Sequence, residues 1–188
     1  MTRLFTALAI LSLTSFGAFA QSNEAPADDQ DAPAIIGEAP MTLGRMAEIV
    51  FALDPNAQNN GGSFQMVIDG TPIVIITDVR ADRMRAMTPI REAAAVSDEE
   101  LRRMMQANFD TALDARYAIA QGTLWATFIH PLAALEKDQL LSALGQTINL
   151  ARTYGTLYSG GGIAYGQGDS TPLQRQLIEE LLQQGEEI

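Results

Sequence analysis

An Asp-Gly pair between two strand-like runs is the feature that most constrains the fold of this chain. Residues 63–79 read SFQMVIDGTPIVIITDV, with Asp69 and Gly70 in the middle. Asp-Gly is favoured in tight β-hairpin turns, where the central residues adopt positive φ. Apolar and polar residues alternate in the first run, so we expect one wet face. The second run, around 73–76, is apolar on both faces and is predicted to be a central strand covered on two sides.

Four segments have the apolar periodicity of α-helices. The first has Thr42 as its N-cap and stops at Asp54-Pro55, and the second begins with the capping box 97–100. A third begins near Lys137 and ends before Gly155, and a short last one covers 172–184. The expected buried stripe of the second helix consists of Leu101, Met104, Met105 and Phe109 (or Asn108).

Three more strand-like runs follow at 83–90, 115–121 and 123–129, whereas residues 56–62 are rich in Asn and Gly and are predicted to be a loop. Pro89 marks the first of these runs as an edge strand or the end of a strand. The core candidates of the last two strands are Tyr117, Ile119, Leu124, Trp125 and Phe128. The order helix, three strands, helix, two strands, helix predicts an α+β fold with an antiparallel sheet.

The two ends of the chain differ in composition from its centre. Residues 1–20 have a basic start, a short apolar run and small residues up to Ala20, which is typical of a secretory signal peptide cut after that residue. An uncleaved anchor is the alternative. Residues 21–40 carry five acids and no base, which predicts an acidic disordered linker. We expect an α+β domain over 41–166 and an acidic tail with a short amphipathic helix over 167–188.

Charge and composition exclude several functional classes. The 188 residues have a net charge of −11, yet 41–166 hold 13 acids and 10 bases, so most of the acidity lies in the tails. This balance argues against nucleic acid and against an anionic membrane surface. Beyond residue 20 no apolar run approaches about 18 residues, so we expect no membrane insertion after signal cleavage. The absence of cysteine excludes disulfides, thiolate metal sites and a cysteine nucleophile.

Four stretches together resemble the YbjN-like proteins, bacterial domains of the type III secretion chaperone-like fold. They are DRMRAMTPI (82–90), NFDTALDARYAI (108–119), FIHPLAAL (128–135) and TYGTLYSGGGIAYG (153–166). The resemblance spans about residues 42–166 and implies the same order of helices and strands. Secretion chaperones of this fold are cytosolic homodimers that hold unfolded effector segments, and the predicted signal peptide departs from them. We therefore expect an exported version, on the strength of the signal-peptide pattern, and the resemblance informs the fold more than the function.

The arginine cluster of Arg80, Arg83, Arg85 and Arg91 is the strongest polar candidate site. Strand alternation places Arg83 and Arg85 on one face, where carboxylates of the chain itself or of a partner could meet them. Two interpretations are open. The face is either solvated and laced with salt bridges, or it docks an acidic or carboxylate-bearing partner.

His130 is the only histidine of the chain, so it cannot belong to a His-rich metal site. Its role is either structural, through hydrogen bonding, or catalytic or pH-sensing. Gly160-Gly161-Gly162 lacks the Lys-Ser/Thr ending of a phosphate-binding P-loop and is predicted to be a flexible turn. Because no nucleophile with a base, metal-ligand cluster or cofactor fingerprint can be assembled, we assign no catalytic, metal or cofactor-binding residue and expect no cofactor.

We therefore predict a non-enzymatic protein-binding module, periplasmic or secreted, that is chaperone-like or regulatory and acts through an apolar groove or sheet surface. The partner is a protein or peptide, or a second copy of the chain in a homodimer. The alternative is a small-molecule or envelope-stress sensory domain that uses the Arg-bearing face. The last helix packs on its own domain or docks into a groove of another protein. The predicted partner-binding residues are Arg80, Arg83, Arg85, Arg91 and His130.

Overall fold

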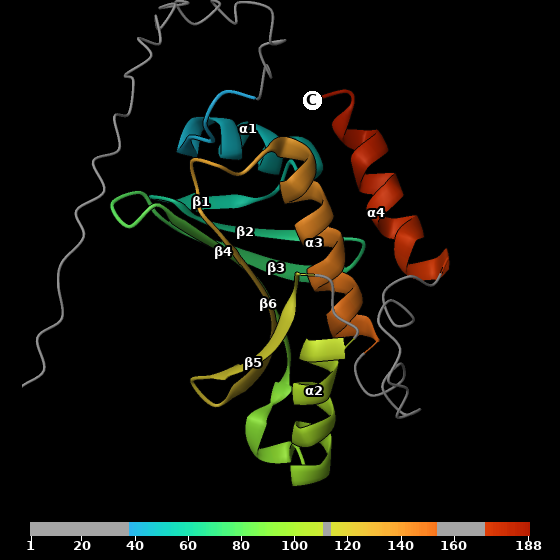
Figure 1. Ribbon diagram of the computed structural model, residues 1–188. Coiled ribbons are helices and arrows are strands. Elements are labelled where there is room, and N and C mark those ends of the chain that lie inside the picture. Colours follow the sequence, from blue (N-terminus) through green and yellow to red (C-terminus); the bar gives the residue numbers. More distant parts are fainter. Residues whose placement is uncertain (1–37, 111–113, 154–171) are drawn as a thin grey trace, which may run out of the picture. The chain divides into compact units, whose positions relative to one another are not determined.

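The computed structural model describes residues 38–110, 114–153 and 172–188, which form one α+β domain (Figure 1). The predicted signal peptide, the linker up to residue 37 and Gly160–Gly162 lie outside the described residues. The elements in chain order are α1 (Leu43–Leu53), β1 (Gln58–Asn60), β2 (Ser63–Ile68), β3 (Thr71–Asp78), β4 (Arg83–Glu92), η1 (Ala93–Ala95), α2 (Asp98–Asp110), β5 (Arg116–Ala120), β6 (Thr123–His130), α3 (Lys137–Arg152) and α4 (Pro172–Gly185).

The six strands form one antiparallel sheet in the order β1-β2-β3-β4-β6-β5. The predicted hairpin turn joins β2 and β3, with φ of 45° at Asp69 and 74° at Gly70. Positive φ at both positions matches the right-handed twist of the flanking strands. The predicted α+β class and the antiparallel sheet are confirmed.

The predicted loop 56–62 contains a strand, so that expectation is wrong. Strand β1 pairs with β2 through a turn at Gly61 and Gly62, both of which have positive φ. Asn and Gln are poor strand formers, and the three residues of β1 are all exposed, so neither propensity nor alternation revealed this strand.

Helices α1, α2 and α3 pack on one face of the sheet, and Figure 1 shows α3 lying across the strands with α4 beside it. Phe64 and Ile75 of the sheet share a buried cluster with α1 and α3. A second cluster joins Met104 of α2 to Tyr117 and Leu124 at the other end of the sheet. The core therefore lies between the sheet and this single helical layer.

Strand β4 lies in the middle of the sheet, between β3 and β6, so its prediction as an edge strand is wrong. A proline cannot donate a hydrogen bond to a neighbouring strand. The sheet accommodates Pro89 with a register shift between Pro89 and Arg91 against β6. The proline thus marks a bulge inside the sheet instead of its edge.

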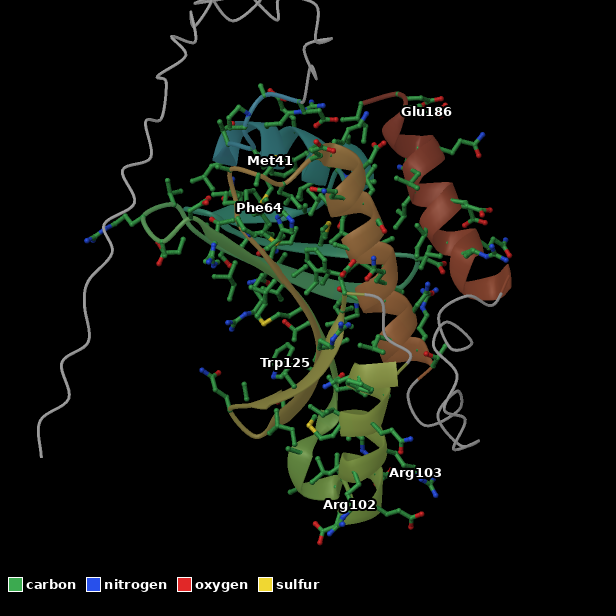
Figure 2. All side chains as sticks on the ribbon, in the orientation of Figure 1. Met41, Phe64, Arg102, Arg103, Trp125 and Glu186 are labelled. Carbon is green, nitrogen blue, oxygen red and sulfur yellow. The ribbon has the colours of Figure 1, made fainter. Side chains whose placement is uncertain are left out.

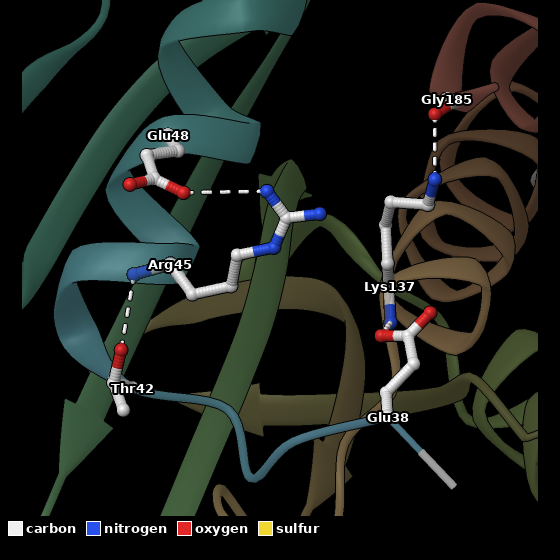
Figure 3. Close-up of polar contacts among 6 residues, drawn as sticks. All are labelled: Glu38, Thr42, Arg45, Glu48, Lys137 and Gly185. Atoms are coloured by element: carbon white, nitrogen blue, oxygen red, sulfur yellow. Dashed lines mark hydrogen bonds and ion pairs between the residues drawn. The ribbon is translucent and has the colours of Figure 1, made fainter. Parts of the chain in front are cut away.

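The predicted starts of the first and second helices are confirmed. The Thr42 hydroxyl accepts a hydrogen bond from the Arg45 N–H at 3.1 Å (Figure 3). In the capping box, the Glu100 carboxylate accepts from the Ser97 N–H at 2.8 Å, and the Ser97 hydroxyl accepts from the Glu100 N–H at 3.2 Å. These bonds satisfy main-chain donors that the first helical turn leaves free.

Helix α4 packs against α3 of its own domain. The two helices approach closely at Gly145, which has no side chain: a Cβ at this position would lie only 2.7 Å from Cγ1 of Ile178. Leu181 is buried in the main cluster, and the Lys137 ammonium donates to the Gly185 carbonyl at 2.7 Å (Figure 3). Of the two alternatives for the last helix, the structure shows the internal one.

Candidate functional site

The sheet face opposite the helices carries no helix of the described residues, and we call it the open face. Residues directly opposite each other on antiparallel strands point to the same side, so the registers define its membership. Its side chains are those of Gln58, Asn60, Ser63, Gln65, Val67, Pro72, Val74, Ile76, Asp78, Arg83, Arg85, Met87, Pro89, Glu92, Arg116, Ala118, Ala120, Thr123, Trp125, Thr127 and Ile129.

The prediction that β3 is covered on both faces is wrong. Ile73 and Ile75 are buried under the helices, whereas Ile76 on the open face is 46% exposed. Ile129 of β6, on the same face, is 53% exposed. Apolar residues at every position of a strand show that both of its faces are hydrophobic. They do not show that both faces are buried, because the packing of the helices decides which face is covered.

A hollow of about 440 Å³ lies at one corner of the open face, where β3, β4 and β6 meet. Arg85 stands opposite Ile76 on β3 and opposite Ile129 on β6. The hollow is lined by Ile76, Thr77, Asp78, Ala81, Arg83, Met84, Arg85 and Ile129. Two guanidinium groups, one carboxylate and two exposed isoleucines therefore share one depression.

The side chain of Arg85 has no hydrogen bond or ion pair to any of the described residues. Arg83 donates to the Asp82 carbonyl at 2.9 Å, which is a bond to its own neighbour along the chain. The four ion pairs among the described residues involve neither of these arginines. Neither guanidinium group in the hollow thus forms an ion pair with a carboxylate in the described part of the chain, although the carboxylate of Asp78 also lines the hollow.

The acids nearest in sequence are occupied by main-chain donors. One Asp78 carboxylate oxygen accepts from the N–H groups of Arg80 and Ala81, at 2.9 and 3.0 Å. The Asp82 carboxylate accepts from the Ala133 N–H at 2.7 Å. These bonds shape the β3–β4 turn and tie it to the segment after β6, so both carboxylates act as turn-forming groups.

The structure separates the five predicted partner-binding residues. Arg83 and Arg85 lie together on the open face, and Arg80 lies in the adjacent β3–β4 turn. Arg91 follows the bulge, stands opposite a residue of the helical side and forms an ion pair with Glu100 of α2 at 3.7 Å. It therefore belongs to another surface.

His130 also lies away from the arginine pair. It stands opposite Met84, on the helical side of the sheet, and its ring stacks on Phe128 with the centroids 5.9 Å apart. Its Nδ1 lies 2.8 Å from the Pro131 carbonyl, to which it donates. These contacts are those of a structural histidine at the end of a strand.

Two edges of the sheet are closed by side chains. The Asn108 amide of α2 accepts from the Tyr117 N–H at 2.7 Å and donates to the Tyr117 carbonyl at 3.1 Å, as a neighbouring strand would. Where β1 ends, the Asp54 carboxylate accepts from the Val67 N–H of β2 at 2.8 Å. Capped edges resist the addition of a foreign strand at these positions.

Sequence reasoning missed three apolar members of the open face, which are Ile76, Ile129 and Trp125. The only available signal was that β3 and β6 carry apolar residues at both alternating positions. Expectations for three core residues also fail. Met105 and Phe109 of α2 are exposed, Phe109 at 74%, and Ile119 is exposed on the outermost strand β5. Helix α2 instead packs against the sheet through Met104 and Ala107.

No group of three or more His, Asp or Glu side chains in the described ranges could hold a metal ion. None of the helices in the part of the chain that the structure describes has the length and apolar character of a membrane span.

No protein-family model matches this chain, and no curated protein matches it. Among solved structures, a chain of the ExsC–ExsE complex aligns with a TM-score of 0.50 and 11% identity, over 65% of this chain and 99% of that one. A chain of the HopA1–SchA chaperone–effector complex aligns at 0.46 and 13% identity, over 58% of this chain and 91% of that one. A chain from the complex of the Yersinia pestis type III secretion chaperone SycH with a fragment of YscM2 aligns at 0.44 and 15%, over 57% and 99%.

At identities this low, structural similarity informs the fold alone, because one fold hosts many functions. The ExsC–ExsE match covers nearly all of the other chain, so it aligns a whole fold and not a fragment. The chain therefore has an α+β fold, with a six-stranded antiparallel sheet and a helical layer, that is similar to the fold of the aligned chain of the ExsC–ExsE complex.

Proposed function

We propose that this protein is a non-enzymatic protein-binding module whose open face docks an apolar, acid-bearing segment of another protein. The observation that carries the proposal is the arginine hollow, in which Arg85 lacks a carboxylate among the described residues and stands between two exposed isoleucines. The similar chain of the ExsC–ExsE complex binds another protein, which is in keeping with a protein partner.

The physical argument joins an apolar and an ionic term. Covering Ile76 and Ile129 removes apolar surface from water, which favours association at roughly 25 cal/mol per Å² buried. A docked chain also displaces water from around Arg85, so a carboxylate that arrives with it interacts with the guanidinium in a less polar medium. Such a pair adds specificity and speeds the encounter, because the charged corner attracts acidic partners.

We further propose that the chain is exported, with cleavage after Ala20, and that it acts in the periplasm or outside the cell as an exported relative of the YbjN-like proteins. The basic start, apolar run and small residues of 1–20 support this proposal. A cytosolic effector is then not its client. A second copy of the chain is a further candidate partner, since Met105 and Phe109 leave an apolar strip on α2 exposed.

A small-molecule or envelope-stress sensory domain is the alternative. The volume of the hollow, about 440 Å³, falls within the range of small-ligand sites, roughly 300–1,000 Å³. The hollow lies on a sheet face, however, and His130 stands on the other side of that sheet. The convergence of Arg83, Arg85 and His130 that would favour a ligand site is therefore missing.

The test compares two charge-matched variants in a pull-down from envelope extracts with the mature chain, residues 21–188. Arg83→Ala/Arg85→Ala removes two cations from the open face, and Arg102→Ala/Arg103→Ala removes two exposed cations from α2. We expect the first variant to lose the captured protein and the second to retain it, with melting temperatures within about 2 °C of the wild type. Equal capture by both variants would contradict docking at the open face. Capture of no protein, together with stabilisation by a small-molecule fraction of the extract, would favour the sensory alternative.

A further inference from the structure

Trp125 lies half-buried on the open face, although the sequence pattern predicted that it would be a core residue. It stands opposite Pro89 of β4 on one side and opposite Ala118 of β5 on the other. In Figure 2 its side chain extends from β6 on the side away from α2. The indole is therefore part of the same surface as Arg85, two rows farther along the strands.

The indole is held in place by its own chain. Its N–H donates to the Ala120 carbonyl at 3.1 Å, so its one polar atom is already satisfied. The flanking Pro89 and Ala118 side chains are short and leave part of the ring uncovered. An immobilised ring that presents only its apolar surface binds an apolar side chain at little cost in conformational entropy.

The bulge after Pro89 sets the charges at this end of the open face. Past the register shift, Arg91 faces the helical side and pairs with Glu100. Glu92 then stands opposite Thr123, on the open face. The face therefore has two guanidinium groups and the Asp78 carboxylate at the Arg85 end, and the Glu92 carboxylate beyond the Trp125 end, so its two ends differ in charge.

The spacing of the two features follows from the strand geometry. Pro89 is four residues beyond Arg85 in β4, which corresponds to about 14 Å at roughly 3.4 Å per residue. An extended segment that runs along β4 covers this distance in four residues of its own. Its side chains at positions i and i+4 both point toward the sheet, because side chains of an extended chain alternate.

We propose that Trp125 and Pro89 form a second subsite of the open face, which binds a leucyl or prolyl side chain four residues away from the acidic residue that meets Arg85. This inference rests on the proposed function and specifies its partner, an extended protein segment of the pattern acid-x-x-x-apolar. The acid forms charge-assisted hydrogen bonds with the guanidinium. The apolar side chain covers the indole, and aromatic residues in such positions carry a large share of the binding free energy at protein interfaces.

The single tryptophan makes the subsite directly observable, since its fluorescence reports only position 125. The probe is a synthetic ten-residue peptide of Ser, Thr and Gly with Glu at position 3 and Leu at position 7. Its matched control has the same composition with Leu at position 6, which places the two side chains on opposite faces of an extended chain. We expect the first peptide to change the tryptophan emission saturably and to bind at least about fivefold more tightly than the control.

Three variants complete the test. Trp125→Ala should weaken binding of the first peptide roughly tenfold or more, measured by anisotropy of a labelled peptide, and Trp125→Phe should restore part of the affinity. Phe109→Ala, which removes an exposed aromatic ring from α2, should leave binding unchanged. Circular dichroism of each variant checks the fold, and the emission change of the wild-type protein needs no variant at all.

The outcomes separate this inference from the proposed function. Binding that depends on Arg85, with unchanged tryptophan emission and equal affinity for both peptides, would overturn the second subsite and leave the docking surface standing. If no peptide that carries an acidic and an apolar residue binds in a way that depends on Arg85, whatever the spacing of the two residues, both the second subsite and the proposed function would be overturned.

Discussion

Replacement of Asn108 by Ala should destabilise the domain by opening the edge of strand β5. The Asn108 side chain makes two hydrogen bonds with the main chain of Tyr117, at 2.7 and 3.1 Å. A net contribution of about 0.5–1.5 kcal/mol per bond gives about 1–3 kcal/mol for the pair. Ala is the better helix former by about 0.5 kcal/mol, which offsets part of this loss. We therefore expect a decrease of about 1–2 kcal/mol in the free energy of unfolding.

Urea denaturation followed by circular dichroism measures this change, since the free energy of unfolding falls linearly with denaturant concentration. Hydrogen exchange at the Tyr117 amide supplies a local measurement, because this N–H donates to Asn108 and should lose most of its protection. Arg102→Ala, at an exposed position of the same helix, is the control. A decrease below about 0.3 kcal/mol, with the Tyr117 amide still protected, would refute the reasoning that a side chain closes this edge.

A second consequence concerns association. An uncovered strand edge offers unpaired main-chain groups to another chain. We expect the weight-average mass of Asn108→Ala to increase with protein concentration more steeply than that of Arg102→Ala, as measured by sedimentation velocity. The same weight-average mass for both variants over a hundredfold concentration range would show that the Asn108 cap does not protect the protein from strand addition.

Three further substitutions test the packing around the site. Leu181→Ala should lower the free energy of unfolding by about 2–4 kcal/mol because Leu181 is buried in the main cluster, and a cost below about 1 kcal/mol in urea denaturation would mean that α4 is not packed on α3. Arg152→Gln removes an exposed ion pair with Asp69 of 2.6 Å, together with hydrogen bonds to the Thr71 hydroxyl and the Asp69 carbonyl. The part of its cost that decreases with added salt should be about 0.2–1 kcal/mol, and a loss wholly independent of salt would contradict an ionic contribution. Ser97→Ala removes one half of the capping box and should cost about 1 kcal/mol, whereas no change in the thermal unfolding midpoint would show that Glu100 alone holds the start of α2.

Local signals predicted most of the fold because the chemistry that determines them lies within a few residues. The Asp69-Gly70 turn needs positive φ at two successive positions, and this pair tolerates it. The hydroxyls of Thr42 and Ser97 satisfy main-chain donors only three residues away. Strand β1 was missed because its exposed Gln and Asn residues carry no apolar alternation.

The candidate site was predicted only in part. Alternation placed Arg83 and Arg85 on one face, and the register confirms that they share it. Arg91 appeared to belong with them until the bulge after Pro89 turned it to the helical side, where it meets Glu100. A register shift of this kind depends on the pairing of two distant strands, so no local pattern announces it.

What the sequence determined by itself is the order of the helices and of every strand except β1, and the division between a balanced centre and acidic ends, because periodicity, capping residues and charge are properties of short segments. What only the tertiary structure decided is which apolar surfaces are covered. The helices of the described residues all pack on one face of the sheet, so Ile75 is buried while its neighbour Ile76 is exposed. Hydrophobicity makes burial favourable for both residues, but long-range packing determines which one the chain buries and which one stays exposed.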